Sequence, residues 1–450
     1  MSETAIEPSP QFRPSLFHIA LAVPWIAVVV SAFQRIGDNS FLWHIRAGEL
    51  QAVGGAVLTS DPFSFTAAGE AWRTQSWLVE LLYAWLETRA GLSFTGWMVG
   101  VVSALTVVGL GLIAHRYSRS VPATSIVLLL SAVLLPQFLV PRPVLFSFLF
   151  FVLVILAWDH ERGLRWSLPL LFWLWASVHG SFIVGLGYLA LRVIKDREPQ
   201  ASQMVVVSGL ATLMTAHGLG IFEILWDFVG ARPYLALISE WQTPNLLEPR
   251  FLPMLLAVFL IVYGAARGRV DASQLWLFAP FFAFGVSAER AVVMGWIALL
   301  PMISLSLRGM SVKWAREFPK PVAVGFVGLI ALLPMFLVEG TGLDDATLPV
   351  AAAGSLEAVR TFHDDFVGGY LIWLDGPQRR VYIDDRAELY QNRLREFLEV
   401  RAARTDWQPV FERNAIEQVL LRNGDALLRL LEAEGWRTVY RDEVYSIMRP

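Results

Sequence analysis

Long apolar stretches separated by short polar connections fill most of the 450-residue chain. Eleven can be marked: Leu16–Phe33, Leu92–Ala114, Pro122–Val140, Val144–Trp158, Leu168–Val178, Phe182–Val193, Met204–Ala216, Phe251–Ala266, Leu275–Val286, Ala291–Leu307 and Val322–Val338. Several are shorter than the roughly 20 residues that a helix needs to cross a membrane. The pattern predicts an α-helical polytopic membrane protein with about eleven transmembrane helices. The first stretch is expected to stay uncleaved, because no small-x-small cleavage site follows it.

Composition supports this class. Hydrophobic residues make up 55% of the chain and charged residues only 17%, against about 25% charged in an ordinary soluble protein. The absence of cysteine excludes disulfides and thiolate metal sites. A net charge of −3 gives no reason to expect nucleic acid as a partner.

Lysine and arginine are concentrated in alternate connections. The basic set comprises Arg116, Arg119, Arg162, Arg165, Arg192, Lys195, Arg197, Arg267, Arg269, Arg308, Lys313, Arg316 and Lys320. The other set carries only Arg142 and Arg290 at its shortest turns. Because basic connections stay in the cytoplasm, we expect a cytoplasmic N-terminus and outer loops at 35–91 and 216–250. Within these loops, Trp77–Leu92 and Ile221–Ala236 are expected to be helices lying along the membrane surface.

The composition changes after Val338. Residues 344–450 are charged and broken by turns, so the chain divides into a transmembrane domain (1–340) and a small extracytoplasmic α/β domain. Strands are expected at Tyr370–Leu374, Arg380–Ile383, Gln418–Leu421, Arg437–Tyr440 and Val444–Met448, with helices at Glu388–Ala403 and Asp425–Glu434. The last two strands should form a hairpin around Asp442 and Glu443. In the middle of the apolar region, His179-Gly180-Ser181 is either a tight turn between two spans or a break inside one helix.

The stretch from Gly37 to Glu80 is unusually rich in polar and aromatic residues for so apolar a chain, which makes it the first candidate for function. Asp38 follows the first apolar stretch, where a carboxylate can take a proton from a sugar hydroxyl or bind a divalent cation. Alone it would be an ordinary solvated helix flank. The polar company that favours a functional role consists of Trp43, His44, Arg46, Asp61, Trp77 and Glu80. Asp61 precedes a proline and is also an ordinary turn opener.

Arg142 and Arg290 run against the charge rule for outer turns, and a forked guanidinium suits a phosphate. The alternative is an arginine that snorkels at a helix end. His44, His179 and His217 could bind a metal together, but their spacing matches no known ligand pattern, which favours packing roles. Glu240 ends the second outer loop and can turn toward the same site. The Asp384-Asp385-Arg386 run either binds a ligand or caps the next helix.

Several motifs resemble bacterial membrane proteins related to the GT-C glycosyltransferases, which include protein mannosyltransferases and lipid A aminoarabinose transferases. They are D-x-x-x-x-W-H-I-x-x-G from Asp38, then D-P-F-S-F-T, G-x-x-W, W-L-x-E, R-P-x-L-F-S, H-G-S-F-I-x-G, S-E-W-x-x-P, and G-G-Y-L-I-W…V-Y-I-D-D-R-x-E-L-Y. The resemblance implies an inverting hexosyltransferase that uses a polyprenyl-phosphate sugar, with or without a divalent cation (Mg²⁺ or Mn²⁺). Asp38 would be the general base or a metal-linked group. The next outer loop, Val140–Pro143, lacks the second acidic residue common in that group, so Asp61 or Glu80 would stand in.

The resulting hypothesis is a transferase in the bacterial inner (plasma) membrane. The lipid donor enters from the outer leaflet and Arg142 and Arg290 hold its phosphate, while Asp38 deprotonates the hydroxyl of an envelope glycan, lipid or protein. Trp43, Trp72 and Trp77 would stack on sugar rings or anchor the chain at the membrane interface. His44, Arg46, Glu80, His179 and Glu240 complete the expected substrate site. The alternatives are a lipid or glycolipid transporter, against which the nearly charge-free spans argue, and a non-catalytic envelope scaffold on a degenerate transferase fold.

Overall fold

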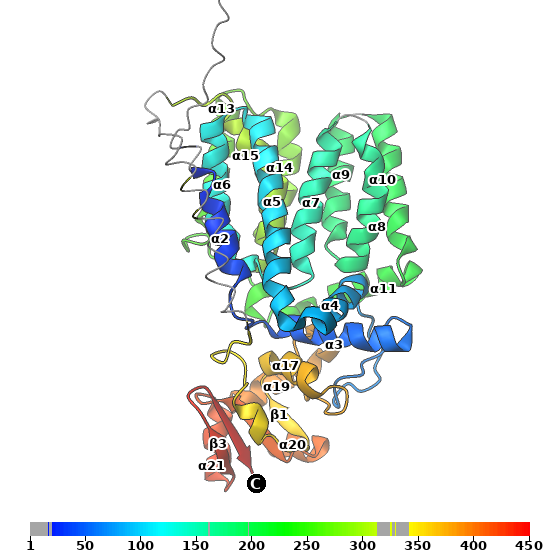
Figure 1. Cartoon of the computed structure of the whole chain (residues 1–450), viewed down its shortest axis with the longest axis vertical. Coiled ribbons are helices and arrows are strands. Elements are labelled where there is room, and N and C mark those ends of the chain that lie inside the picture. Colours follow the sequence, from blue (N-terminus) through cyan, green and yellow to red (C-terminus); the bar gives the residue numbers. More distant parts are fainter. Residues whose placement is uncertain are drawn as a thin grey trace, which may run out of the picture.

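The computed structural model describes residues 20–160, 163–196, 198–312 and 342–450, together with Phe17, Gly325 and Leu329. It is mostly helical and ends in a small sheet. Ten helices run side by side as a bundle (Figure 1): α2 (Val23–Ala32), α5 (Phe94–Ser118), α6 (Val121–Leu134), α7 (Val144–Asp159), α8 (Leu168–Val178), α9 (Phe182–Asp196), α10 (Pro199–Ala211), α13 (Leu252–Ala266), α14 (Ala272–Gly285) and α15 (Val292–Ser306).

Each of the first ten expected apolar stretches overlaps one of these helices. The eleventh, Val322–Val338, lies outside the described residues apart from Gly325 and Leu329. Among the described residues, two helical stretches are long and apolar enough to cross a membrane, Trp77–Ser118 and Glu289–Ser306. A third joins them if the pair Ala201–Met214 and Gly218–Gly230, bent by 104°, counts as one span. About eleven transmembrane helices therefore stays a prediction.

Helix α15 forms the centre of the bundle, where it packs on α5, α13 and α14. All its residues are buried, as expected for a helix that is apolar on every side. Its two serines, Ser304 and Ser306, are satisfied because their hydroxyls donate to carbonyls one turn earlier. Close packing depends on small residues: a Cβ on Gly264 of α13 would lie 2.3 Å from the Ser306 Oγ.

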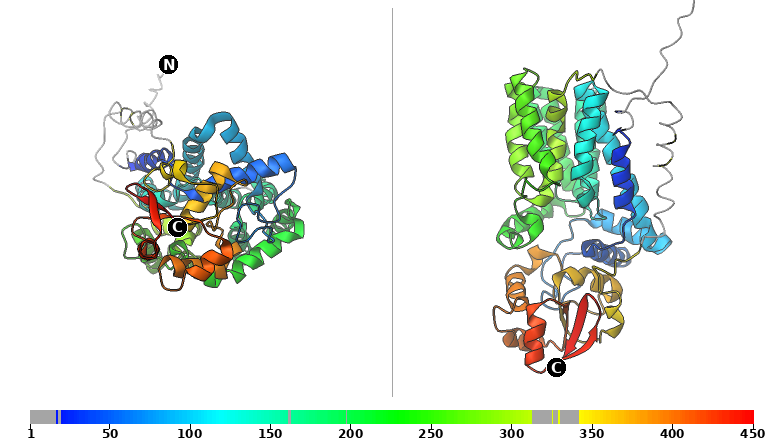
Figure 2. Two further views of the ribbon diagram at one scale, coloured as in Figure 1. Left: turned by 90° about the horizontal axis from the view of Figure 1, so that it is seen from below. Right: turned by 90° about the vertical axis from the view of Figure 1, so that its left-hand side faces the viewer.

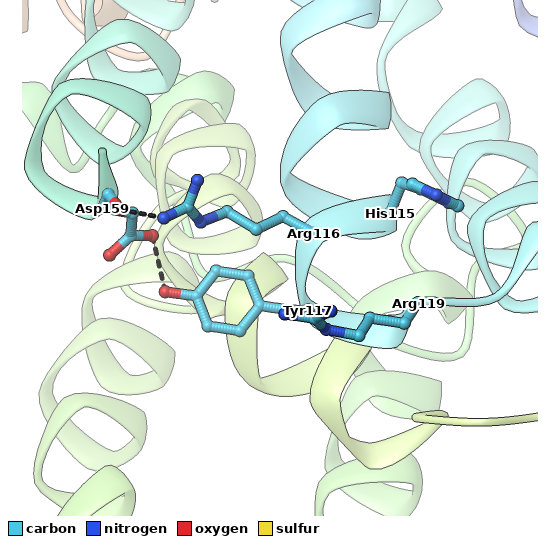
Figure 3. Close-up of a pocket in the computed structure, with 5 residues that line it drawn as sticks. All are labelled: His115, Arg116, Tyr117, Arg119 and Asp159. Atoms are coloured by element: carbon cyan, nitrogen blue, oxygen red, sulfur yellow. Dashed lines mark hydrogen bonds between the residues drawn. The ribbon is translucent and has the colours of Figure 1, made fainter. Parts of the chain in front are cut away.

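The basic connections meet at one end of the bundle. There Arg192 pairs with Asp159 (2.8 Å) and Arg165 with Glu198 (2.5 Å). A hollow of about 600 Å³ lies beside them, lined by His115, Arg116, Tyr117, Arg119 and Asp159. In Figure 3, Arg116 and Tyr117 point toward Asp159, whereas His115 points away. Arg162, Arg197, Lys313, Arg316, Lys320 and the N-terminal 16 residues lie outside the described part of the chain.

The opposite end is covered by helices that run across the bundle: α3 (Asn39–Gly54), α4 (Trp77–Ala90), α11 (Ile221–Gly230) and α12 (Arg232–Leu235). Figures 1 and 2 show α3 and α4 between the bundle and the C-terminal domain. The helices expected at Trp77–Leu92 and Ile221–Ala236 are confirmed as helices. The expectation of a long loop from Gly37 to Glu80 was wrong over α3, which the Asp38 side chain caps and Gly55 ends at a φ of 63°.

The C-terminal domain holds a four-stranded sheet in the order β1-β2-β4-β3: β1 (Thr361–His363), β2 (Gln418–Arg422), β3 (Arg437–Arg441) and β4 (Tyr445–Arg449). β1 is parallel to β2, with Phe362 opposite Val419, and the other pairs are antiparallel. The hairpin of the last two strands is confirmed. The helices are α17 (Asp365–Asp375), α18 (Ala387–Tyr390), α19 (Asn392–Arg401), α20 (Gln408–Asn414) and α21 (Ala426–Ala433).

Two of the expected strands were wrong. Tyr370–Leu374 belongs to helix α17, because Asp364 caps a helix here and a short apolar run can be buried in either conformation. In Arg380–Ile383 only Val381 makes a β-bridge, to Ser64 in the segment between α3 and α4. Strand β1 and helix α20 were not predicted.

Residues 35–91, expected from the sequence to be the first outer loop, share one hydrophobic core with the C-terminal domain. Buried residues of both, among them Phe41, Phe63, Phe362 and Tyr382, belong to a single cluster. Backbone hydrogen bonds also join them, from Val381 N to the Phe63 carbonyl (2.9 Å) and from Phe65 N to the Val381 carbonyl (3.0 Å). The polar loop thus connects the helical bundle to the sheet domain.

Candidate functional site

Asp38 and Arg142 meet where the bundle ends. Asp38 precedes α3, and its Oδ1 accepts the backbone N–H of Phe41 (3.1 Å). Its Oδ2 accepts from Nε of Arg142 in the turn before α7 (2.6 Å). Arg142 Nη1 donates to both carboxylate oxygens of Glu240 (3.1 and 2.9 Å). Burial opposes the charge of Arg142, but the two carboxylates outweigh it, so the pKa of Arg142 lies above its ordinary value.

Arg290 is the second cation of the site. It lies in a short turn of 3-10 helix, Glu289–Ala291, and its guanidinium stacks over the Trp241 ring at 4.5 Å. Among the described residues, no carboxylate lies within 4.0 Å of it. The charge of Arg290 nevertheless affects Glu240. Burial raises the pKa of Glu240, but the charges of Arg142 and Arg290 lower it below its ordinary value. Arg290 thus keeps its hydrogen-bond donors for another anion.

His179 lies in the turn between α8 and α9, close enough to Arg290 for the charge of Arg290 to act on its imidazole. The backbone N–H of Ser181 donates to His179 Nδ1 (3.2 Å), so the neutral ring carries its proton on Nε2. Burial, helped by the charge of Arg290, lowers the pKa of His179 to about 3. The residues His179-Gly180-Ser181 form a turn between two helices, and a Cβ on Gly180 would lie 2.0 Å from Gln75 Nε2. His179 is therefore a neutral ring whose Nε2–H is a hydrogen-bond donor.

Glu80, in contrast, is committed to the protein interior. Its side chain is fully buried and accepts from His44 Nδ1 (2.7 Å), Gln51 Nε2 (2.6 Å) and the Thr74 hydroxyl. It thereby fastens the first turn of α4 to α3 and to the loop between them. A buried carboxylate that accepts from three protein donors has a structural role. Its partner His44 has a structural role too, because its Nδ1 is bound to Glu80.

Asp61 is also enclosed. It accepts from the backbone N–H groups of Phe63 (3.1 Å) and Ser64 (3.0 Å) and from Arg386 Nη2 (2.8 Å). Arg386 stacks over Trp72 at 4.4 Å and also pairs with Asp384 (2.7 Å). Asp61 therefore joins the outer loop to the C-terminal domain, away from any exposed surface.

The remaining expected residues divide between these roles. Arg46 pairs with Glu49 and donates to the Trp373 carbonyl, so it joins α3 to α17. Trp77 is half-buried, and its indole N–H has no hydrogen-bond partner among the described residues. Trp43 stacks on His44 with ring centres 3.6 Å apart and donates to Asp385 (2.7 Å). The sequence left open whether Asp385 binds a ligand or caps a helix. It did not predict the contact between Asp385 and Trp43 of α3.

Within the described residues, no group of three or more His, Asp or Glu side chains is arranged to hold a metal ion. His217 donates its Nε2–H to the Thr74 carbonyl oxygen (2.8 Å), apart from the Asp38 and Arg142 pair. The donor set of the described residues therefore does not fit the Mg²⁺ or Mn²⁺ that the resemblance allows.

Comparison of the chain with models of known protein families and with curated proteins found no match.

Proposed function

We propose that this protein is a GT-C-like glycosyltransferase of the bacterial inner membrane, which transfers a sugar from a polyprenyl-phosphate donor to an envelope acceptor on the outer face. The bundle's outer surface supports the membrane location. Along α5 an exposed apolar stripe follows the helical repeat, with side chains 43% to 58% exposed: Trp97, Val101, Leu105, Val108 and Leu112. Water-soluble monomers rarely expose continuous apolar surfaces of this kind, whereas lipid would cover them.

The helices at the site end agree with this placement. Leu82 and Trp85 on α4, and Phe222 and Trp226 on α11, are exposed apolar side chains next to a polar layer. Such helices fit the boundary between headgroups and acyl chains. With the basic connections in the cytoplasm, the polar site and the C-terminal domain lie at the outer surface.

The observation that carries the proposal is the free guanidinium of Arg290. It rests on Trp241 and has no carboxylate within 4.0 Å among the described residues, while Arg142 is held by two carboxylates. A phosphate would complete the donor set of Arg290, with His179 Nε2–H as a second donor. In this arrangement the lipid phosphate can leave, because Arg290 stabilises the charge that develops on it.

The reaction is a single displacement. A carboxylate of the site takes the proton of the acceptor hydroxyl, and the oxygen attacks the anomeric carbon from the face opposite the phosphate. The new carbon–oxygen bond forms as the bond to the phosphate oxygen breaks, and the electron pair of that bond remains on the phosphate. The configuration at the anomeric carbon is inverted. The resemblance to the GT-C enzymes implies that Asp38 is the base. Asp38 also accepts a hydrogen bond from Arg142 Nε, which keeps that guanidinium in position.

The test is transfer of labelled sugar from a polyprenyl-phosphate donor in proteoliposomes, with the native chain compared with Arg290→Gln. Charge-assisted hydrogen bonds contribute about 1.5–3 kcal/mol each, so the variant should lose roughly tenfold to a hundredfold in donor kcat/KM. Arg250→Gln is the matched control, because Arg250 lies at the same end but is exposed and already paired with Glu248 and Glu289. Equal transfer by native protein and folded Arg290→Gln would overturn the proposal.

A non-catalytic envelope scaffold is the second candidate. The observation in its favour is that Asp61 and Glu80, both expected in the site, spend their hydrogen bonds inside the protein. A native protein that binds envelope glycans and transfers no sugar over a panel of donors would favour this function.

A further inference from the structure

Two adjacent carboxylates of the C-terminal domain have opposite surroundings. Asp384 is buried and accepts four hydrogen bonds: from the backbone N (3.0 Å), Nε (2.8 Å) and Nη2 (2.7 Å) of Arg386, and from the Tyr390 hydroxyl (2.8 Å). Burial raises the pKa of Asp384, but the charge and hydrogen bonds of Arg386 lower it by more. The pKa of Asp384 therefore lies below its ordinary value. Asp384 is a structural group, and its acceptor capacity is filled.

Asp385 turns the other way, toward α3. Its Oδ1 accepts Trp43 Nε1–H (2.7 Å), and the Ser40 side chain also bonds it. Among the described residues, Asp385 forms no ion pair within 4.0 Å. It is half-buried and held by neutral donors, so it keeps acceptor capacity that no cation occupies.

The surroundings raise the proton affinity of Asp385. Burial raises its pKa most, the charge of Arg142 opposes this, and Asp384 and Asp38 raise it again, so the pKa lies above the ordinary aspartate value. The charged groups that act on it or on which it acts are Asp38, Arg142, Asp365, Asp384, Arg290 and Glu388. A carboxylate with raised pKa is a better proton acceptor near neutral pH than an ordinary one.

Asp38 has the opposite arrangement. One of its oxygens accepts the Phe41 N–H and the other the Arg142 Nε–H. The Asp38 carboxylate forms an ion pair with Arg142 and keeps its guanidinium in position. Arg142 also pairs with Glu240. Asp38 is therefore engaged in an ion pair, whereas Asp385 forms none within the described part of the chain, and carboxylates in such different environments can take different roles.

We infer that Asp385 of the C-terminal domain is the catalytic base that takes the proton of the acceptor hydroxyl, and that Asp38 is a positioning residue for Arg142. The inference rests on the proposed function. The proton moves from the hydroxyl to a carboxylate oxygen of Asp385 as that hydroxyl oxygen bonds to the anomeric carbon. The donor's carbon–oxygen bond breaks toward the phosphate beside Arg290. Trp43 sets the orientation of Asp385, so the site is complete only with the C-terminal domain docked on α3.

Transfer kinetics of the full-length protein in proteoliposomes test this assignment. Asp385→Asn should lower kcat by at least about a hundredfold and leave the KM for the donor within about threefold of native. Native transfer should fall as pH falls through the raised pKa of Asp385, and this acid limb should vanish from the residual rate of Asp385→Asn. Asp385→Glu should restore part of kcat. Asp38→Asn should mainly raise the KM for the donor and keep the acid limb. Asp345→Asn, an exposed residue paired with Arg35, is the control.

The outcomes separate the two proposals. Native transfer together with an unchanged kcat and acid limb in Asp385→Asn would overturn the assignment of Asp385 and leave the transferase standing. A failure of the native protein to transfer any sugar would overturn both. Infrared difference spectra against pH give a readout without turnover. Because Asp365 and Glu388 also have raised pKa values, the readout is the native spectrum minus that of Asp385→Asn, which should contain a protonated carboxyl band that titrates above the ordinary aspartate pKa. Identical carboxyl bands in the two proteins would also overturn the assignment.

Discussion

Replacing Asp61 by asparagine should loosen the C-terminal domain. The side chains of Asp61 and Arg386 are 0% and 1% exposed, and their ion pair spans the contact between the segment that joins α3 to α4 and the domain. Asparagine keeps one oxygen as an acceptor, but it removes the charge and brings an NH₂ group among the N–H donors of Phe63, Ser64 and Arg386. The change leaves a buried guanidinium with one carboxylate instead of two.

The magnitude follows from the burial of the pair. Removing one partner of a buried ion pair costs about 3–5 kcal/mol. Arg386 keeps its pair with Asp384, so we expect the lower end, about 3 kcal/mol. For a unit of about 100 residues, each kcal/mol lowers the unfolding temperature by about 4–8 °C. The domain should therefore unfold at least about 10 °C lower.

Glu70→Gln is the matched control. Glu70 pairs with Arg393 and joins the same loop to the same domain, but the two side chains are 45% and 38% exposed. Exposed ion pairs contribute at most about 1 kcal/mol. The measurement is the temperature at which the C-terminal domain becomes sensitive to protease in detergent-solubilised protein, for native chain and both variants.

Two outcomes would refute this reasoning. Equal small shifts in both variants would mean that burial does not separate the two pairs. An unchanged unfolding temperature in Asp61→Asn, together with lost sugar transfer, would instead give Asp61 the catalytic role that the sequence suggested.

Two further predictions concern stability. Gly48→Ala should cost about 1–3 kcal/mol or more, because its Cβ would lie 1.9 Å from the Glu80 carbonyl oxygen where α3 crosses α4; Gly54→Ala in the same helix meets nothing within 4 Å and should be neutral or slightly stabilising in the same thermal unfolding measurement. Because Arg386 holds the pKa of Asp384 below its ordinary value, Asp384 stabilises the fold above the unfolded-state pKa of about 3.9, and this stability is lost as pH falls through the folded-state pKa. The pKa values of Glu240 and Asp364 are lowered too, so unfolding temperatures should fall less steeply with acid in Asp384→Asn than in the native protein; an identical acid limb in the variant would contradict the assignment.

Local patterns in the sequence predicted the helices well. Apolar runs can be satisfied only by burial or by lipid, so ten of the marked stretches contain helices. Basic residues in alternate connections also indicated which connections share an end. The Tyr370–Leu374 stretch shows where local patterning fails, because its apolar residues are buried equally well in helix α17.

The roles of the polar residues required the fold. Asp61 and Asp38 look alike in sequence, but the partner of Asp61 is Arg386, 325 residues away, and the partner of Asp38 is Arg142. Asp384 and Asp385 are neighbours, yet one binds Arg386 and the other reaches Trp43, 342 residues earlier. The sequence by itself determined where helices form and which segments carry charge, since these depend on nearby residues. Only the tertiary structure decided which charges are neutralised inside the protein and which remain for a substrate, because that depends on packing between segments hundreds of residues apart.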